Sequence, residues 1–166
     1  MTTTITGATG VNQITDDAIT SAKLPTGSVL QVIGAVVSST TTVSSNSYAD
    51  ISLQAAITPS SASNNILISV NVPLRKNNGS SNDTAGHIRI VRGSTVVQEF
   101  GRYLAWNNTS SKHQQQTAAF QCLDINADTT SATTYKVQLK ASINGMSVAS
   151  CHDSSQASIT LMEIAG

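Results

Sequence analysis

Three adjacent residues near the end of the chain have side chains that carry out covalent chemistry in many enzymes. Cys151, His152 and Asp153 offer a nucleophile, a base and an acid. Neighbouring residues at the end of a strand point to alternate sides, however, and catalytic triads are assembled from distant positions. The pattern therefore favours a strand that runs into a polar turn, and we expect no catalytic residues and no enzymatic activity.

A short acidic segment has the opening pattern of a calcium-binding loop. Asp124, Asn126 and Asp128 follow the order D-x-N-x-D, in which alternate oxygen ligands converge on one cation. Thr129 stands where the sharp turn of such a loop needs glycine, and Tyr135 stands where a bidentate glutamate closes it. We therefore expect an Asx-rich turn at the end of a strand, and no metal site.

The histidines and cysteines do not form a recognisable ligand set. His87, His113 and His152 lack the spacing of a zinc site, so we expect them to be solvated. Cys122 and Cys151 are too few for a disulfide scaffold, and whether they bond to each other stays open. The chain also has no phosphate loop and no dinucleotide fingerprint, so no cofactor is expected.

One polar segment combines aromatic rings with amide side chains. Tyr103 and Trp106 precede Asn107 and Asn108 in a stretch that we expect to be a surface loop. Flat apolar rings and directional amide hydrogen bonds are what carbohydrate recognition uses. Two interpretations stay open: the segment is a ligand-binding loop, or Trp106 anchors it to the core.

Composition excludes several classes of function. The chain has 166 residues, which is one ordinary domain, and its nine basic and nine acidic residues cancel. Without a net positive field, we expect neither nucleic acid nor an anionic membrane as a partner. No apolar run approaches the roughly 20 residues of a membrane span, and the first residues show no signal peptide. These features indicate a structural or binding domain.

From residue 28 onward, apolar and polar residues alternate over short segments with polar turns between them. This pattern predicts an all-β antiparallel β-sandwich, jelly-roll-like, over residues 28–166. Gly93-Ser94 and Asn144-Gly145 are two-residue hairpin signals, and the second is the stronger. The predicted strands span residues 28–37, 48–57, 65–75, 86–92, 95–100, 117–124, 134–143, 146–151 and 156–164.

Residues 1–27 differ in composition from the rest and form an N-terminal arm. The arm is polar, and residues 15–24 have the pattern of about two helical turns that end at Pro25. Such a short extended or helical arm buries too little to be stable alone, so we expect it to lie against another subunit or protein. Its candidate partner-binding residues are Ile5, Val11, Ile14, Ile19 and Leu24.

The first and last predicted strands carry apolar residues on both faces. A β-sandwich buries only one face of each sheet, so the second apolar face must be covered by something else. The arm or a loop is one candidate cover, and a subunit interface around a symmetry axis is the other. We favour the interface, in a homotrimer. Its candidate residues are Val29, Ile33, Val37, Met162 and Ile164.

Three stretches resemble parts of a known group of proteins. Residues 16–32 resemble the linker that enters the terminal domain of tail-fibre and virion structural proteins of bacteriophages, especially aquatic and cyanobacterial phages. Residues 57–68 are similar to an inter-strand turn of these domains, and residues 157–164 resemble their closing strand. The resemblance implies a trimeric jelly-roll-like knob that serves as a fibre tip or as a shell decoration.

The short arm decides between these two roles. Only about 27 residues precede the knob, whereas a fibre subunit carries a long shaft. We therefore expect a capsid decoration (cement) protein on the particle surface, anchored to the major capsid protein by its arm and made in the host cytoplasm. The alternative is a tail-fibre or tail-tip subunit, held by a tail adaptor, that recognises host-surface glycan through the aromatic segment.

Overall fold

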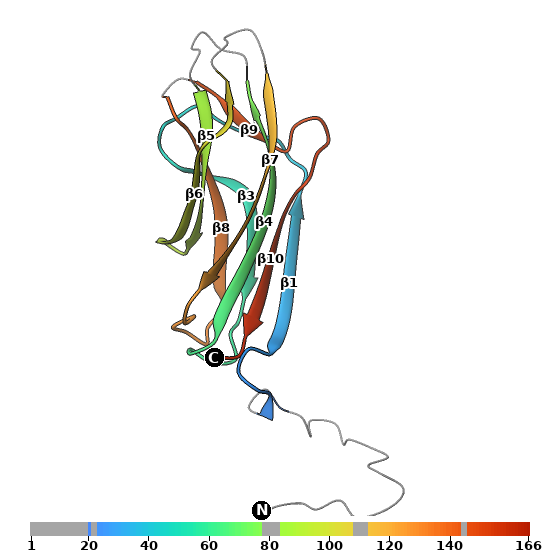
Figure 1. Ribbon diagram of the computed structural model, residues 1–166, viewed down its shortest axis with the longest axis vertical. Helices are drawn as coiled ribbons and strands as arrows, with labels where there is room; N and C mark the ends of the chain where they lie inside the picture. Colours follow the sequence, from blue (N-terminus) through green and yellow to red (C-terminus); the bar gives the residue numbers. More distant parts are fainter. Residues whose placement is uncertain (1–19, 21–22, 78–83, 108–112, 144–145) are drawn as a thin grey trace, which may run out of the picture.

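The computed structural model describes residues 20, 23–77, 84–107, 113–143 and 146–166. These residues form two antiparallel β-sheets packed face to face, with the long strands running along the molecule (Figure 1). The all-β sandwich predicted from the sequence is confirmed. The strands are β1 (Val29–Val37), β2 (Thr41–Val43), β3 (Ala49–Ile57), β4 (Asn65–Lys76), β5 (Thr84–Arg92), β6 (Thr95–Asn107), β7 (Gln114–Asp124), β8 (Thr133–Ala141), β9 (Val148–Ser150) and β10 (Ala157–Ile164).

One sheet, here sheet A, contains β1, β2, β4, β7, β9 and β10. β7 pairs with β4 along one edge, from Ile66 to Lys76. Both β10 and β9 must therefore pair with the other edge of β4, one after the other. β1 and β2 extend the sheet beyond β10 and β9 in the same way. Sheet A is thus four strand positions wide.

The other sheet, sheet B, has the order β3-β8-β5-β6. Its two-residue turn at Gly93-Ser94 joins β5 to β6, with Arg92 opposite Thr95, as the sequence predicted. Most other connections cross from one sheet to the other, so neighbouring strands in a sheet are distant in sequence. This is the pairing pattern of a jelly roll.

The core lies between the sheets and is built by the predicted alternation. In β3, Ile51, Leu53, Ala55 and Ile57 face inward and are buried, while the alternate residues Ser52, Gln54 and Ala56 are exposed. β4 and β8 repeat the pattern, and Tyr135 of β8 has no exposed surface. Each such large apolar side chain stabilises the fold by about 1.5–3 kcal/mol.

Two sequence predictions about connections are wrong. The strands before and after Asn144-Gly145 do not form a hairpin, because β8 lies in sheet B and β9 lies in sheet A. Both edges of β8 are already occupied by β3 and β5, which leaves no edge for β9. The predicted strand over residues 95–100 is also too short, since β6 continues to Asn107.

The start of β1 is fastened to the end of β10 at one pole of the molecule (Figure 1). The amide of Gly27 donates to the carbonyl of Ala165 at 2.8 Å, and the amide of Ala165 donates to the carbonyl of Ser28 at 2.9 Å. The described part of residues 1–27 is therefore attached to the sandwich. Most of the helical pattern predicted at residues 15–24 lies outside the described residues.

A buried carboxylate strengthens the same pole. Glu163 of β10 has no exposed surface. Its Oε1 accepts hydrogen bonds from the amide and hydroxyl of Ser60 and from Asn64 Nδ2, and its Oε2 accepts one from Gln31 Nε2. These bonds join β1, β10 and the turn between β3 and β4, so the polar cluster fixes three segments that meet there.

Candidate self-association surface

A continuous apolar row crosses the outer face of sheet A. Val32 pairs with Met162, Met162 pairs with Leu67, and Leu67 pairs with Leu123, so one side chain from each of four strands lies in line. Val32 is 56% exposed and Leu123 is 46% exposed. We call these four residues the apolar row. No segment among the described residues covers it.

The apolar row has further apolar neighbours toward the pole at which β1 begins and β10 ends. Val29 pairs with Ile164, one step along the strands from the row, and Ile125 follows directly after β7. Val29 and Ile125 are both more than half exposed. On the other side of the row, the outer face continues with small, uncharged residues: Gly34, Thr160, Ser69 and Gln121.

Charge is almost absent from this face. Among the described residues of β1, β10, β4 and β7, one charged side chain faces outward. It is Arg75, near the far end of β4. An exposed apolar row with almost no charge around it is a candidate contact surface for another protein.

The outer face of sheet B provides an internal comparison. Its matching row consists of Glu99, Arg89, Gln138 and Asp50, one residue from each of four strands. Arg89 Nε donates to Gln138 Oε1 and Gln138 Nε2 donates to Asp50 Oδ1, both at 2.7 Å. This charged, hydrogen-bonded row is typical of a surface that faces solvent, and it distinguishes the two faces of one molecule.

The structure divides the predicted interface residues between two sides of sheet A. Val29, Met162 and Ile164 lie on the outer face, as the interface requires. Ile33 and Val37 face inward and pack against the core, so they are not available to a neighbouring subunit. The exposed apolar residues of β1 are instead Val29, Val32 and Val36.

Sequence reasoning did not identify the central part of this surface. It missed Leu67 and Leu123, because alternation along a strand shows only that residues share a face. Which residues of β4 and β7 stand opposite each other depends on the register of strands far apart in the chain. The sequence did indicate an outer apolar surface, because β1 and β10 carry apolar residues on both of their faces.

The predicted partner-binding residues of the arm fall mostly outside the described part of the chain. Ile5, Val11, Ile14 and Ile19 are among the residues that the structure does not describe. Leu24 is described, is 37% exposed and lies at the base of β1. There it lines a cavity together with Leu30, Asn64 and Gly166.

The predicted aromatic loop is part of a strand. Tyr103, Trp106 and Asn107 belong to β6, whereas Asn108 lies outside the described residues. Trp106 is 45% exposed, so its ring is not buried in the core. A strand fixes the spacing of its side chains, and the adaptable loop expected for ligand contacts is therefore absent from residues 103–107.

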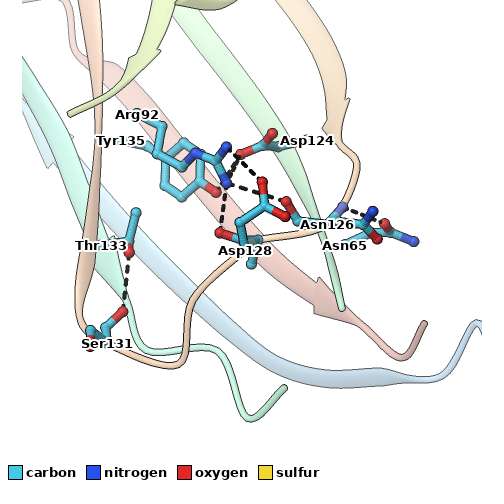
Figure 2. A network of polar contacts seen from close by, with 9 residues as sticks. Asn65, Arg92, Asp124, Asn126, Asp128, Ser131, Thr133 and Tyr135 are labelled. Atoms are coloured by element: carbon cyan, nitrogen blue, oxygen red, sulfur yellow. Dashed lines mark hydrogen bonds and ion pairs between the residues drawn. The ribbon is translucent and has the colours of Figure 1, made fainter. Parts of the chain in front are cut away.

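The acidic segment after β7 encloses an arginine (Figure 2). The guanidinium of Arg92 donates to the carbonyls of Ala127, at 2.6 Å, and Asn126, at 3.2 Å. It also lies 3.4 Å from the carboxylates of Asp124 and Asp128. The oxygens that a calcium loop would direct at a cation are thus directed at this side chain. No cluster of three or more metal-ligating residues occurs in the described ranges.

The network in Figure 2 extends into the core through Tyr135. The Tyr135 hydroxyl donates to Asp124 Oδ2 at 2.7 Å. Burial, followed by the neighbouring carboxylate of Asp124, raises the pKa of Tyr135 above its ordinary value. The phenol therefore remains a hydrogen-bond donor over the whole physiological range, and the turn after β7 is locked to β8.

Cys151, His152 and Asp153 do not form a catalytic triad. The Cys151 thiol is buried and contacts the carbonyl of Val37 at 3.6 Å, while His152 Nδ1 lies 2.9 Å from Asp153 Oδ2. The nucleophile thus points away from the base. Cys122 and Cys151 are both free thiols, and burial raises the pKa of Cys122 to about 11, with a smaller contribution from Asp124.

Comparisons with protein-family models and with curated proteins find no match to this chain. The described residues also contain no helix with the length and hydropathy of a membrane span. The outer face of sheet A is therefore the feature from which a function has to be argued.

Proposed function

We propose that this chain is a structural protein of a bacteriophage particle, a homotrimer that decorates the capsid surface and is anchored there by residues 1–27. It has no enzymatic role in this proposal. The observation that carries the proposal is the uncharged outer face of sheet A with its apolar row. The phage assignment and the number of subunits rest on the resemblance of residues 16–32, 57–68 and 157–164 to phage virion domains.

Several features support self-association through this face. Burying Val32 and Leu123 against another copy removes apolar surface from water, at about 25 cal/mol per Å². Because the face has almost no charge, two copies meet without repulsion and without the cost of desolvating ions. In a closed ring of identical subunits, the same face is covered in every copy, and no apolar surface stays open.

The direct test places a charge in the middle of the apolar row. We expect Leu67→Glu to convert an assembly of three times 17.2 kDa into a monomer, measured by size exclusion with light scattering. Leu123→Glu, on a more exposed residue, is expected to have the same effect. A carboxylate buried in an apolar contact costs several kcal/mol, roughly enough to abolish a weak interface.

The matched control is Gln54→Glu, which places the same charge on the exposed outer side of β3 in sheet B. Circular dichroism should show that all three variants keep the β-sandwich. A wild-type chain that is monomeric at high concentration, or a Leu67→Glu chain that stays trimeric, would count against the proposal.

The location on the particle needs a separate measurement. Immunogold electron microscopy with an antibody to residues 28–166 should label the heads of intact particles. A chain that lacks residues 1–22 should fold, since it keeps the hydrogen bonds of Gly27 and Ser28, but should no longer bind capsids. Label confined to fibre ends would favour the alternative, and no label on any particle would exclude a virion protein.

One observation favours the alternative function, a tail-fibre or tail-tip subunit that recognises host-surface glycan. Trp106 is nearly half exposed on β6, and an exposed indole is a good stacking platform for a sugar ring. In this case Trp106→Ala should lower adsorption to host cells without altering assembly. Unchanged adsorption would remove the reason for this alternative.

A further inference from the structure

A small cavity lies at the far end of the outer face of sheet A, away from the apolar row. It has a volume of about 370 Å³ and lies between β4, β7 and the connection from β9 to β10. Pro73 and Thr117, which pair with each other, form its floor. The amide of Cys151 donates to the carbonyl of Pro73 at 3.1 Å, so the connection is held against β4 and closes one side.

His152 is a buried polar side chain that lines this cavity. The sequence predicted a solvated histidine here, but the residue is only 6% exposed, so that prediction is wrong for His152. Its Nδ1 is held by Asp153 Oδ2 at 2.9 Å, which fixes the orientation of the ring. None of the hydrogen bonds among the described residues uses Nε2, so this nitrogen remains available to a ligand.

The other polar groups of the cavity are also only partly used. The Ser155 hydroxyl donates to the carbonyl of His152 at 2.6 Å, and its oxygen can still accept. The Asp153 carboxylate uses Oδ2 for both His152 and Arg75, which leaves Oδ1.

Three residues of the connection from β9 to β10 have backbone angles in a sparsely populated region of the Ramachandran map. Cys151, Asp153 and Ser154 have φ angles of 53°, 54° and 64°, in the left-handed region that non-glycine residues seldom adopt. These angles place Asp153 and Ser155 on the rim of the cavity beside the buried His152.

We propose that this cavity binds a single sugar ring. Its mixture of donors and acceptors matches a ligand whose hydroxyls can both donate and accept. Pro73, an outward residue of β4, offers apolar contact for the carbon face of the ring. The site lies at the opposite end of the outer face from Leu67, and the proposal does not depend on self-association or on a virion location.

The experiment is a titration of the full-length, ¹⁵N-labelled chain with glucose, galactose and mannose, followed through the imidazole signals of His152. The sugar concentration should reach about 0.1 M, because a small, shallow site is expected to have millimolar dissociation constants. At least one sugar should shift the His152 signals in a saturable manner. Methyl glycosides that bind as well as the free sugars would indicate chain-linked glycan units as the natural ligand, whereas loss of binding would indicate free sugars.

Two variants and one control locate the binding. Thr117→Val removes an exposed hydroxyl from the floor and should weaken binding about fivefold, while His152→Phe should weaken it more. Thr160→Val changes an outward residue of β10 that does not line the cavity, and it should bind like the wild type. For the variants, binding is followed through the backbone amides of Gln116 and Thr117.

Three results would overturn the proposal. The first is the absence of a saturable shift with any of the sugars. The second is an identical titration curve with glycerol, which would indicate an adventitious additive only. The third is unchanged binding in both Thr117→Val and His152→Phe, checked by circular dichroism to be folded, since the sugar would then bind elsewhere.

Discussion

Glu163 is a carboxylate without exposed surface, and its hydrogen bonds explain how the core tolerates it. Burial alone raises the pKa of Glu163, but hydrogen bonds from Asn64, Gln31 and Ser60 outweigh this and hold it below its ordinary value of 4.5. A carboxyl group with a lowered pKa in the folded chain stabilises the fold when it is ionised. This contribution is complete above the unfolded-state pKa and is lost as the pH falls through the folded-state pKa.

The first prediction concerns this group. Glu163→Gln should lower the free energy of unfolding at pH 7 by about 2 kcal/mol, because an amide cannot accept all four hydrogen bonds. The difference from the wild type should shrink in acid, as the wild-type carboxyl becomes protonated. Urea unfolding, followed by circular dichroism at pH 7 and below pH 4, measures both effects.

The control for this prediction is Glu99→Gln on the surface of sheet B. Glu99 accepts a hydrogen bond from the Tyr48 hydroxyl at 2.7 Å, but it is exposed. We expect its substitution to change stability by less than about 1 kcal/mol. Equal losses in both variants, or a loss for Glu163→Gln that does not depend on pH, would contradict the account given for Glu163.

Arg92 occupies the place that a bound cation would take in the D-x-N-x-D segment. The sequence predicted an Asx-rich turn here, and in the structure two carboxylates of this turn, of Asp124 and Asp128, and the main-chain carbonyl of Asn126 contact the Arg92 guanidinium. This guanidinium comes from β5, a strand more than thirty residues earlier in the sequence. No local pattern could reveal that partner, because β5 and the turn after β7 meet only in the folded sandwich.

At the scale of single strands, the sequence was informative wherever the signal is local. The alternation in β4 and β8 correctly assigned the core face, since every second residue of a strand must point the same way. Glu163 follows Ile159 and Leu161 on the buried face of β10, and strict alternation would have placed it there despite its charge. Its partners in other segments were not predictable.

Strand pairing is where local signals failed. Asn144-Gly145 is a strong turn signal, but a turn sequence does not say whether the two edges it would join are free. Gly93-Ser94 succeeded because β5 and β6 are neighbours in sheet B. The apolar row could not be read from the sequence for a related reason: it depends on the register between β1, β10, β4 and β7, of which β4 and β10 are about ninety residues apart.

The second prediction tests the turn that was assigned correctly. Gly93 has a φ of 59°, in the left-handed region, and no atom lies near the position of an added Cβ. Gly93→Ala should therefore destabilise the chain by about 1 kcal/mol through backbone strain alone. Urea unfolding measures the change. Ser94→Ala, at the other turn position, is the control, and an equal loss there would contradict the assignment to φ.

At the scale of the whole molecule, the two sheets present opposite surfaces. The outer face of sheet B carries several charged side chains. Two of them, Arg89 and Lys140, lie over the ring of Tyr48. The outer face of sheet A carries the apolar row instead. A protein with one charged face and one nearly uncharged face has a preferred direction of packing, which agrees with the proposed ring of subunits.

The third prediction follows from the lack of charge on the proposed interface. Raising sodium chloride from about 0.1 M to about 1 M shortens the Debye length from about 10 Å to about 3 Å, but an apolar contact is not screened. The dissociation constant of the assembly should change by less than about threefold, and sulfate should strengthen it. Sedimentation velocity at several salt concentrations measures this. Dissociation at high salt would indicate an interface held by ion pairs.

The fastening of β1 beside β10 at one pole also determines how the molecule responds to mechanical force. β1 leads away from that pole and β10 returns to it, with Val29 opposite Ile164 at the open end. A load that pulls the two ends apart therefore breaks the hydrogen bonds of this pair one at a time, as in unzipping. A load between one end and the distal turns would instead shear many of these bonds together. The sandwich should consequently yield at low force in the first geometry and resist in the second.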